Sequence, residues 1–321
     1  MLSVNDMKEK FFLAIIIFGL MWGGSALAWQ VETIADLPAA GDFLVFPAKK
    51  EIIMAGGAQE KVEISILNRT GKAQEYTLEV NDLKGSQENE NGLEFGDYAS
   101  YPYSLKKYLR TVDNQVVIGS GQLARAQLEI SLPEEMPPGG LYAIILISQH
   151  SVGDSAGEAK MIGQAGIPIY VKIPGKVVES GATKSFKIDL SALAQRGVGL
   201  KIYFQNDGNI YLAPKGQIEI SDIFGRLVAK KDIPQFYSLP GSYKMVRADW
   251  QNTADVGYYR AVAKVQRGYA GPDGLPLSDQ LSGSFWILSQ RAKITLIGIL
   301  ALVVGVLLFL KIKHARKKFQ Q

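Results

Sequence analysis

Among the residues whose types and spacing suggest chemistry, a cluster of aromatic and basic side chains is the strongest candidate. The cluster comprises Tyr98, Tyr101, Tyr103 and Tyr108, with Lys106 and Lys107 beside them. Tyrosine presents a flat apolar ring and a polar hydroxyl, which suits sugar rings and protein interfaces. The neighbouring ammonium groups would meet the carboxylates of glycans or peptide stems. We predict a ligand-binding surface here; the alternative is that the rings fold back and cap the first domain.

Groups that could carry out catalysis are scarce. The chain has no cysteine and two histidines, which excludes disulfides, thiolate metal sites and cysteine nucleophiles. His150 lies near Ser151 and Asp154, but a Ser-His-Asp site requires the three groups to converge on an oxyanion site. Three polar residues after a strand are a weak signal for a hydrolase. We predict no catalytic residue, no cofactor and no enzymatic activity.

Acidic residues between Gly85 and Asp97 offer oxygen ligands of the kind that calcium prefers. Glu88, Glu90 and Glu94 lie there among asparagines. Their spacing does not match an EF-hand loop, and a solvated loop is the simpler interpretation. We therefore predict no metal site.

The N-terminal end indicates export from the cytoplasm. Residues 1–28 combine early lysines, an apolar run at Phe11–Leu20 and a small-residue cleavage site ending at Ala28. This pattern is typical of a secretory signal peptide. An uncleaved membrane anchor is the alternative, although the apolar run is short for a span.

The C-terminal end predicts a membrane anchor at 291–312. Ile294 to Leu310 contains no charge and no proline. At about 1.5 Å per residue this run approaches the thickness of a bilayer core. The tail at 313–321 is basic and has no acid, so it should be cytoplasmic. The region between the two ends is then exposed at the cell surface or in a periplasm.

The net charge of the region between the two ends differs in sign from that of the whole chain. The whole chain carries a net charge of +4, but residues 29–290 hold 26 basic and 29 acidic residues. The exported region is therefore slightly acidic. It has no basic excess for phosphates, so we predict that nucleic acid is not a partner.

The exported region has the pattern of an all-β protein. Lys61–Ile66, Arg125–Leu132 and Gln217–Ser221 alternate between polar and apolar residues. Alternation buries one face of a strand and exposes the other, as in antiparallel sandwiches. Turn residues rich in Asn, Gly and Pro separate these runs.

A loose internal repeat predicts two similar domains. A strand runs into Asn68 and a turn with Gly71, and a later strand runs into Asn206 and a turn with Gly208. Asn and Gly accept the left-handed conformations of tight turns. We expect a first sandwich at 29–174, with an insertion at about 85–114 that holds the tyrosines, and a second at 175–290. The sequon that begins at Asn68 is interpreted as a turn.

Several stretches resemble the WxL-interacting proteins of bacterial surfaces. They are Phe43–Pro47, Leu132–Tyr142, Phe204–Asn209 and Trp250 with Gly257-Tyr258. The resemblance covers nearly the whole chain, while each stretch alone is common in sandwich domains. It implies a signal peptide, two immunoglobulin-like sandwiches, of which the first binds peptidoglycan, and one C-terminal transmembrane helix. It also implies a partner with a WxL signature, but no ligand-binding residue.

These observations predict a non-enzymatic, membrane-anchored protein of the cell surface. Its first domain would bind peptidoglycan, another cell-wall glycan or a surface protein. The alternative is a chaperone-like or assembly component of a surface or pilus system, since pilus chaperones offer a sheet edge to an incoming strand. An exposed, unpaired strand in the first domain would favour the alternative. An envelope hydrolase using His150 is a third hypothesis.

Overall fold

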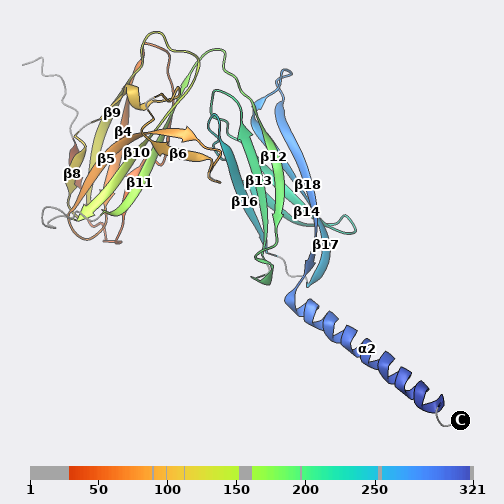
Figure 1. Cartoon of the computed structure of the whole chain (residues 1–321). Helices are drawn as coiled ribbons and strands as arrows, with labels where there is room; N and C mark the ends of the chain where they lie inside the picture. Colours follow the sequence, from red (N-terminus) through yellow and green to blue (C-terminus); the bar gives the residue numbers. More distant parts are fainter. Residues whose placement is uncertain are drawn as a thin grey trace, which may run out of the picture. The chain divides into compact units, whose positions relative to one another are not determined.

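The computed structural model of the chain consists of two compact units built from β-strands and a C-terminal helix (Figure 1). It describes residues 29–318 apart from positions 89, 99, 112, 152–160, 196 and 252–254. The predicted signal peptide, Asp154 and the last three residues of the tail lie outside the described residues. The expectation of an all-β chain with tandem immunoglobulin-like sandwiches and one C-terminal apolar helix is confirmed.

The first unit is a sandwich of two sheets. One sheet has the order β1-β9-β4-β2, with β7 beside β9; the other has the order β3-β11-β10-β5-β6, with β8 beside β5. The strands of the first sheet are β1 (Gln30–Thr33), β2 (Phe43–Phe46), β4 (Gln59–Asn68), β7 (Leu109–Arg110) and β9 (Gln122–Ser131). Those of the other are β3 (Lys50–Ile53), β5 (Gln74–Gly85), β8 (Gln115–Ile118), β10 (Gly139–Ser151) and β11 (Met161–Ile173), and its last strand, β6 (Leu93–Gly96), is grouped with the second unit.

The core of the first unit follows from the predicted alternation. Val62, Ile64 and Ile66 of β4 are fully buried and lie opposite alternate residues of β9, including Leu128. β2 pairs with β4, and after Pro47 the chain crosses to the other sheet, where β3 pairs with β11. The chain from Phe43 to Ile53 therefore contributes to both sheets along one side of the sandwich.

The second unit is a smaller sandwich. One sheet has the order β12-β13-β16, and the other has the order β15-β14-β17-β18. The strands are β12 (Gly181–Asp189), β13 (Gly197–Asn206), β14 (Lys215–Asp222), β15 (Leu227–Ile233), β16 (Tyr243–Gln251), β17 (Val256–Ala270) and β18 (Pro276–Leu288). A short 3-10 helix, η2 (Leu193–Gln195), precedes β13. Trp250 packs edge-on against Tyr259 in the core, with ring centroids 5.0 Å apart.

The units are not divided by a single break near Pro174. Leu83–Gly96 and Pro138–Gly140 belong to the second unit, while Asp97–Pro137 and Leu141–Ile173 belong to the first. The reason is that the hairpin ending in β6 bonds to β16: the Tyr243 amide donates to the Ser86 carbonyl at 2.8 Å, and the Met245 amide donates to the Glu90 carbonyl at 2.8 Å. Of the predicted insertion at about 85–114, only the part from Asp97 onward folds with the first unit.

Two buried asparagines make equivalent turns in the two units. The Asn68 amide group donates to the carbonyls of Lys72 and Ile118, both at 2.8 Å. The Asn206 amide group donates to those of Ile210 at 2.9 Å and Ser238 at 2.7 Å. Both side chains are fully buried. The interpretation of the sequon as a turn is therefore confirmed, because the Asn68 amide is inaccessible to a glycan.

The C-terminal helix, α2 (Gln290–Lys318), begins almost directly after β18. Its stretch Gln290–Lys311 is long and apolar enough to cross a membrane, by length and composition, and none of it is buried. The Ser289 hydroxyl caps the helix by accepting from the Ala292 amide at 3.1 Å. The helix therefore has a defined start without a flexible linker.

Candidate functional site

The predicted tyrosine cluster lies in the first unit with unequal exposure. Tyr101 is buried, whereas Tyr98, Tyr103 and Tyr108 are half-buried. Lys106 pairs with Asp97 at 3.0 Å, and Lys107 is exposed. The structure brings the rings together but turns part of their surface inward.

The ring contacts extend to two tyrosines outside the predicted cluster. Tyr98, Tyr101 and Tyr103 are in edge-to-face contact, with centroids 6.3 and 5.7 Å apart. Tyr103 lies 6.4 Å from Tyr142 of β10, which lies 5.7 Å from Tyr170 of β11. Edge-to-face ring contacts stabilise a fold by more than the burial of their apolar area alone would give. The ladder fixes the segment on the sandwich.

Backbone bonds hold the same segment in place. The Tyr142 amide donates to the Tyr103 carbonyl at 2.8 Å, and the Leu105 amide donates to the Tyr142 carbonyl at 3.1 Å. Leu105 is fully buried in the core, and a 3-10 turn, η1 (Lys106–Tyr108), follows it. The segment is thus partly a structural cap, while part of the Tyr98 and Tyr103 side chains and the Lys107 side chain stay exposed.

His150 does not face a serine nucleophile. Its Nε2 lies 3.0 Å from the Thr77 hydroxyl on the neighbouring strand. Ser151 follows it in β10, so the two side chains point to opposite faces of the sheet. This geometry provides no Ser-His pair at this position.

In the hairpin between Gly85 and Asp97, the Glu94 carboxylate is engaged by neighbouring side chains. Glu94 accepts a hydrogen bond from the Ser86 hydroxyl and pairs with Lys84 at 3.5 Å. The Ser86 bond is the main cause that lowers the pKa of the Glu94 carboxyl. Among the residues that the structure describes, no group of three His, Cys, Asp or Glu side chains is placed to hold a metal ion.

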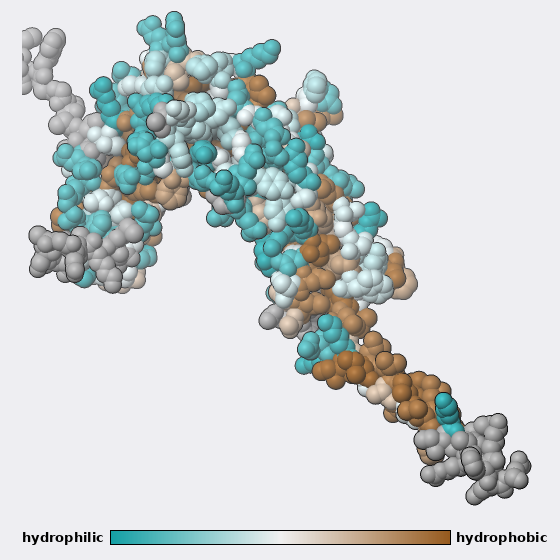
Figure 2. Space-filling view, in the orientation of Figure 1, coloured by the Kyte–Doolittle hydropathy of each residue, from teal (hydrophilic) through white to brown (hydrophobic). Residues whose placement is uncertain are grey.

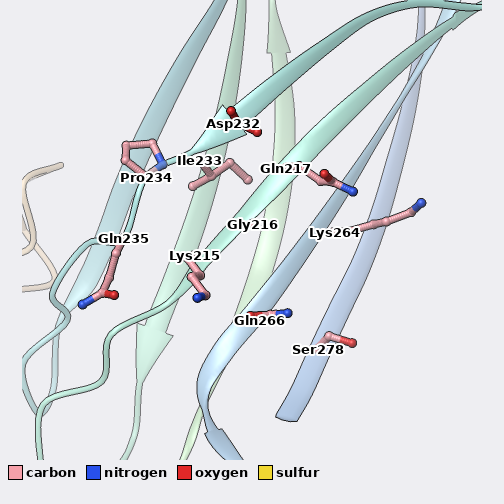
Figure 3. Close-up of a pocket in the computed structure, with 10 residues that line it drawn as sticks. All are labelled: Lys215, Gly216, Gln217, Asp232, Ile233, Pro234, Gln235, Lys264, Gln266 and Ser278. Carbon is pink, nitrogen blue, oxygen red and sulfur yellow. The ribbon is translucent and has the colours of Figure 1, made fainter.

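A hollow of about 580 Å³ lies on the second unit, over the sheet that contains β14 and β17 (Figure 3). Its lining comprises Lys215, Gly216, Gln217, Asp232, Ile233, Pro234, Gln235, Lys264, Gln266 and Ser278. Figure 3 shows the polar ends of these side chains spread apart rather than directed at one point. Lys264 also pairs with Glu219 at 2.7 Å. The hollow therefore offers no focused set of groups for a reaction.

The clearest candidate for an interaction site is an open sheet edge on β11. β10 lies on one side of β11, and on the other side β3 pairs only with Ile169–Lys172. Of the residues that the structure describes, none forms a strand beside the earlier half, Met161–Pro168, on that second side. An unpaired edge of this kind is a template for a further strand.

The direction of the backbone groups along this edge follows from strand geometry. The Lys172 carbonyl accepts from the Met54 amide at 3.1 Å, so Lys172 directs its backbone groups away from β10. Because these directions alternate along a strand, Gln164, Gly166 and Pro168 do the same. Pro168 has no N–H, and proline is tolerated where a strand faces no ladder partner. Gln164 and Gly166 thus direct their N–H and C=O groups to a side on which the described residues form no strand.

Apolar side chains border the open half of β11. Phe43 and Val45 of β2 are half-buried and pack against the core. A Cβ added to Gly163 would lie 3.2 Å from the Phe43 ring, so β2 runs close beside β11 here. An added strand would pair with β11 through its backbone and cover Phe43 and Val45 with alternate side chains.

No protein-family model matches the chain, and no curated protein matches it. The resemblance to WxL-interacting proteins therefore stays a prediction. Among solved structures, the chain is similar to the class 5 fimbriae chaperone CfaA, with 14% identity, a TM-score of 0.37 and coverage of 74% of this chain and 98% of that one. It is also similar to the CupB2 chaperone of Pseudomonas aeruginosa, with 9% identity, a TM-score of 0.34 and coverage of 75% and 98%.

Proposed function

We propose that the chain is a non-enzymatic, membrane-anchored envelope protein that binds an extended segment of a partner protein along the open edge of β11. The observation that carries the proposal is that Gln164 and Gly166 direct their backbone N–H and C=O groups to the open edge, next to the apolar side chains of Phe43 and Val45. This corresponds to the chaperone-like or assembly component considered from the sequence.

The edge defines what kind of segment would bind. Backbone hydrogen bonds give affinity without sequence preference, and alternate side chains give specificity. Pro168 and the start of β3 limit the added strand to the half of β11 before them. A short segment with apolar residues at every second position therefore fits best.

The anchor is the second element of the proposal. α2 would cross the membrane once, with its basic end in the cytoplasm and both sandwiches on the other side. The partner would then be a surface or periplasmic protein that meets the first unit outside the cytoplasm. The predicted signal peptide at 1–28 would deliver the chain there.

The test uses a labelled peptide and the full chain in detergent. The probe is a fluorescein-labelled peptide in which valine alternates with threonine and lysine, and its control has the same composition in scrambled order. Gln164→Pro removes one edge-facing N–H, whereas the matched variant Gln164→Ala keeps it. Because one backbone bond contributes about 1 kcal/mol, Gln164→Pro should weaken binding at least about fivefold relative to Gln164→Ala. Equal affinity of the two variants, or no binding of the alternating peptide to the wild type, would contradict the proposal.

A second candidate is glycan binding by the outer part of the tyrosine cluster. The half-buried rings of Tyr98 and Tyr103 and the exposed Lys107 favour it. The test is sedimentation of the full chain with isolated peptidoglycan in detergent. A chain with Tyr98→Ala and Tyr103→Ala should stay in solution while the wild type pellets; a wild type that does not pellet would end this hypothesis.

A further inference from the structure

Exposed apolar side chains gather at one end of the second sandwich, in what we call the apolar rim. The rim comprises Ile223, Phe224, Leu227, Val256 and Trp286. Asp222 lies opposite Tyr259 and Val256 lies opposite Leu288, so the β14–β15 turn, the start of β17 and the end of β18 share one end of the sheet. Figure 2 shows apolar surface where β18 leads into α2.

The β14–β15 turn presents Phe224 in a fixed conformation. Asp222 accepts hydrogen bonds from the amides of Phe224 at 2.9 Å and Arg226 at 3.0 Å, and its carboxylate pairs with the Arg226 guanidinium at 2.7 Å. The guanidinium lies 5.3 Å from the centre of the Phe224 ring. Phe224 is nevertheless 80% exposed. A rigid turn that exposes an aromatic side chain loses little conformational entropy when that side chain is buried by a partner.

The start of α2 holds this end of the sheet close to the membrane. Ser289 is the only residue between β18 and α2, and its amide donates to the Asp255 carbonyl at 2.8 Å. The uncharged run begins at Ile294, about 6 Å along the helix from Gln290. The headgroup layer on each side of a bilayer is about 5–8 Å thick. The end of β18 therefore lies within reach of the headgroups.

The chemistry of the rim suits that layer. Trp286 is largely exposed and packs against Tyr258, with ring centroids 5.1 Å apart. Tryptophan and tyrosine favour the boundary between hydrocarbon and water. Arg226, Arg291 and Lys293 supply cations at the same end for lipid phosphates.

We propose that the apolar rim docks into the headgroup layer of the bilayer that holds α2, with Phe224 and Trp286 as its anchors. This inference rests on the proposed membrane anchor. Docking would hold the second unit directly against the membrane surface instead of leaving it to pivot about Ser289. The occupant is lipid, because the chain ties this end of the sheet to the membrane without a spacer.

The test exploits the absence of cysteine from the chain, which makes every introduced cysteine unique. Ile223→Cys, Leu275→Cys and Val303→Cys are each labelled with a nitroxide in the full chain, reconstituted in nanodiscs of phosphatidylcholine and phosphatidylglycerol with one copy per disc. Collisions with oxygen and with a water-soluble nickel complex then report the depth of each label. Leu275 is the matched control, since it is as exposed as the rim residues but lies at the opposite end of the sheet.

The three labels separate the inference from the anchor on which it rests. We expect the label at 303 to be deep in the hydrocarbon, the label at 223 to be at headgroup depth and the label at 275 to be in water. Adding Phe224→Asp to the chain labelled at 223 should move that label into water. A deep label at 303 with an aqueous label at 223 would overturn docking and leave the anchor intact. An aqueous label at 303 would overturn the anchor itself. A third outcome would show that the rim contacts a second copy of the chain instead of lipid. In that case the label at 223 would be in water in single-copy discs, and two such labels would broaden each other's spectra in discs that hold two copies.

Discussion

Replacing neighbouring residues of β11 by proline should have opposite consequences, because successive backbone amides of a strand point to opposite sides. Gln164 directs its N–H to the open edge, whereas Ala165 directs its N–H toward β10. Gln164→Pro therefore removes no ladder bond. Ala165→Pro removes one and leaves a β10 carbonyl unpaired in the sheet.

The expected costs can be estimated from these bonds. Gln164→Pro loses the side-chain bond to the Ser148 hydroxyl, which spans 3.0 Å at an exposed position, and should cost about 0.5–1 kcal/mol. Gln164→Ala loses the same bond and should cost about as much. Ala165→Pro should cost about 1–3 kcal/mol for the unpaired carbonyl, with the strain of the ring in addition.

The assay is hydrogen exchange of the buried strand β4, followed by mass spectrometry on the full chain in detergent. Its amides open mainly when the first unit unfolds, so their exchange rate reports the free energy of unfolding of that unit. The Gln164→Pro and Gln164→Ala chains should exchange alike, and the Ala165→Pro chain should exchange faster. Faster exchange in Gln164→Pro than in Ala165→Pro would refute the assignment of the edge.

Three further predictions concern stability. Asn206→Asp should destabilise the second unit by at least about 3 kcal/mol, because a carboxylate would face two carbonyls in place of an amide donor; unchanged thermal unfolding by circular dichroism would contradict this. Bonds from Ser191 and Lys201 hold the pKa of the Asp189 carboxyl well below its usual range, so its stabilisation is present above the ordinary pKa of aspartate and is lost as the pH falls through the lower folded value. The melting temperature of Asp189→Asn should therefore lie below that of the wild type at neutral pH and approach it in strong acid; a constant gap would be inconsistent with this origin. Tyr101→Ala should destabilise the first unit by about 3 kcal/mol because the ring is buried, whereas a Lys107→Ala control should not, as measured by exchange of β4.

Local features of the fold were predictable because they depend on local chemistry. The alternation in β4 and β14 assigned the buried faces, and the turn chemistry of Asn68 and Asn206 predicted the equivalent turns in the two units. The apolar composition of α2 predicted one long, exposed helix.

Long-range contacts were not predictable from these patterns. Nothing in the spacing of the tyrosines shows that Tyr142 and Tyr170 extend their ladder, since these residues come from distant strands. The pairing of the β6 hairpin with β16 likewise joins segments far apart in the chain. A signal for the open edge was present, because Pro168 within an apolar run is typical of an edge strand. Its meaning depends on how far β3 extends along β11, which only the structure gives.

The most direct test of strand addition is hydrogen exchange resolved to single amides of β11, measured on the full chain with and without the alternating peptide. In the free chain the amides of Gln164 and Gly166 should exchange quickly, while those of Ala165 and Ile167 should be protected by β10. Saturating peptide should protect Gln164 and Gly166 and leave the other two unchanged. Protection of Gln164 and Gly166 before the peptide is added, or no change on its addition, would contradict the account.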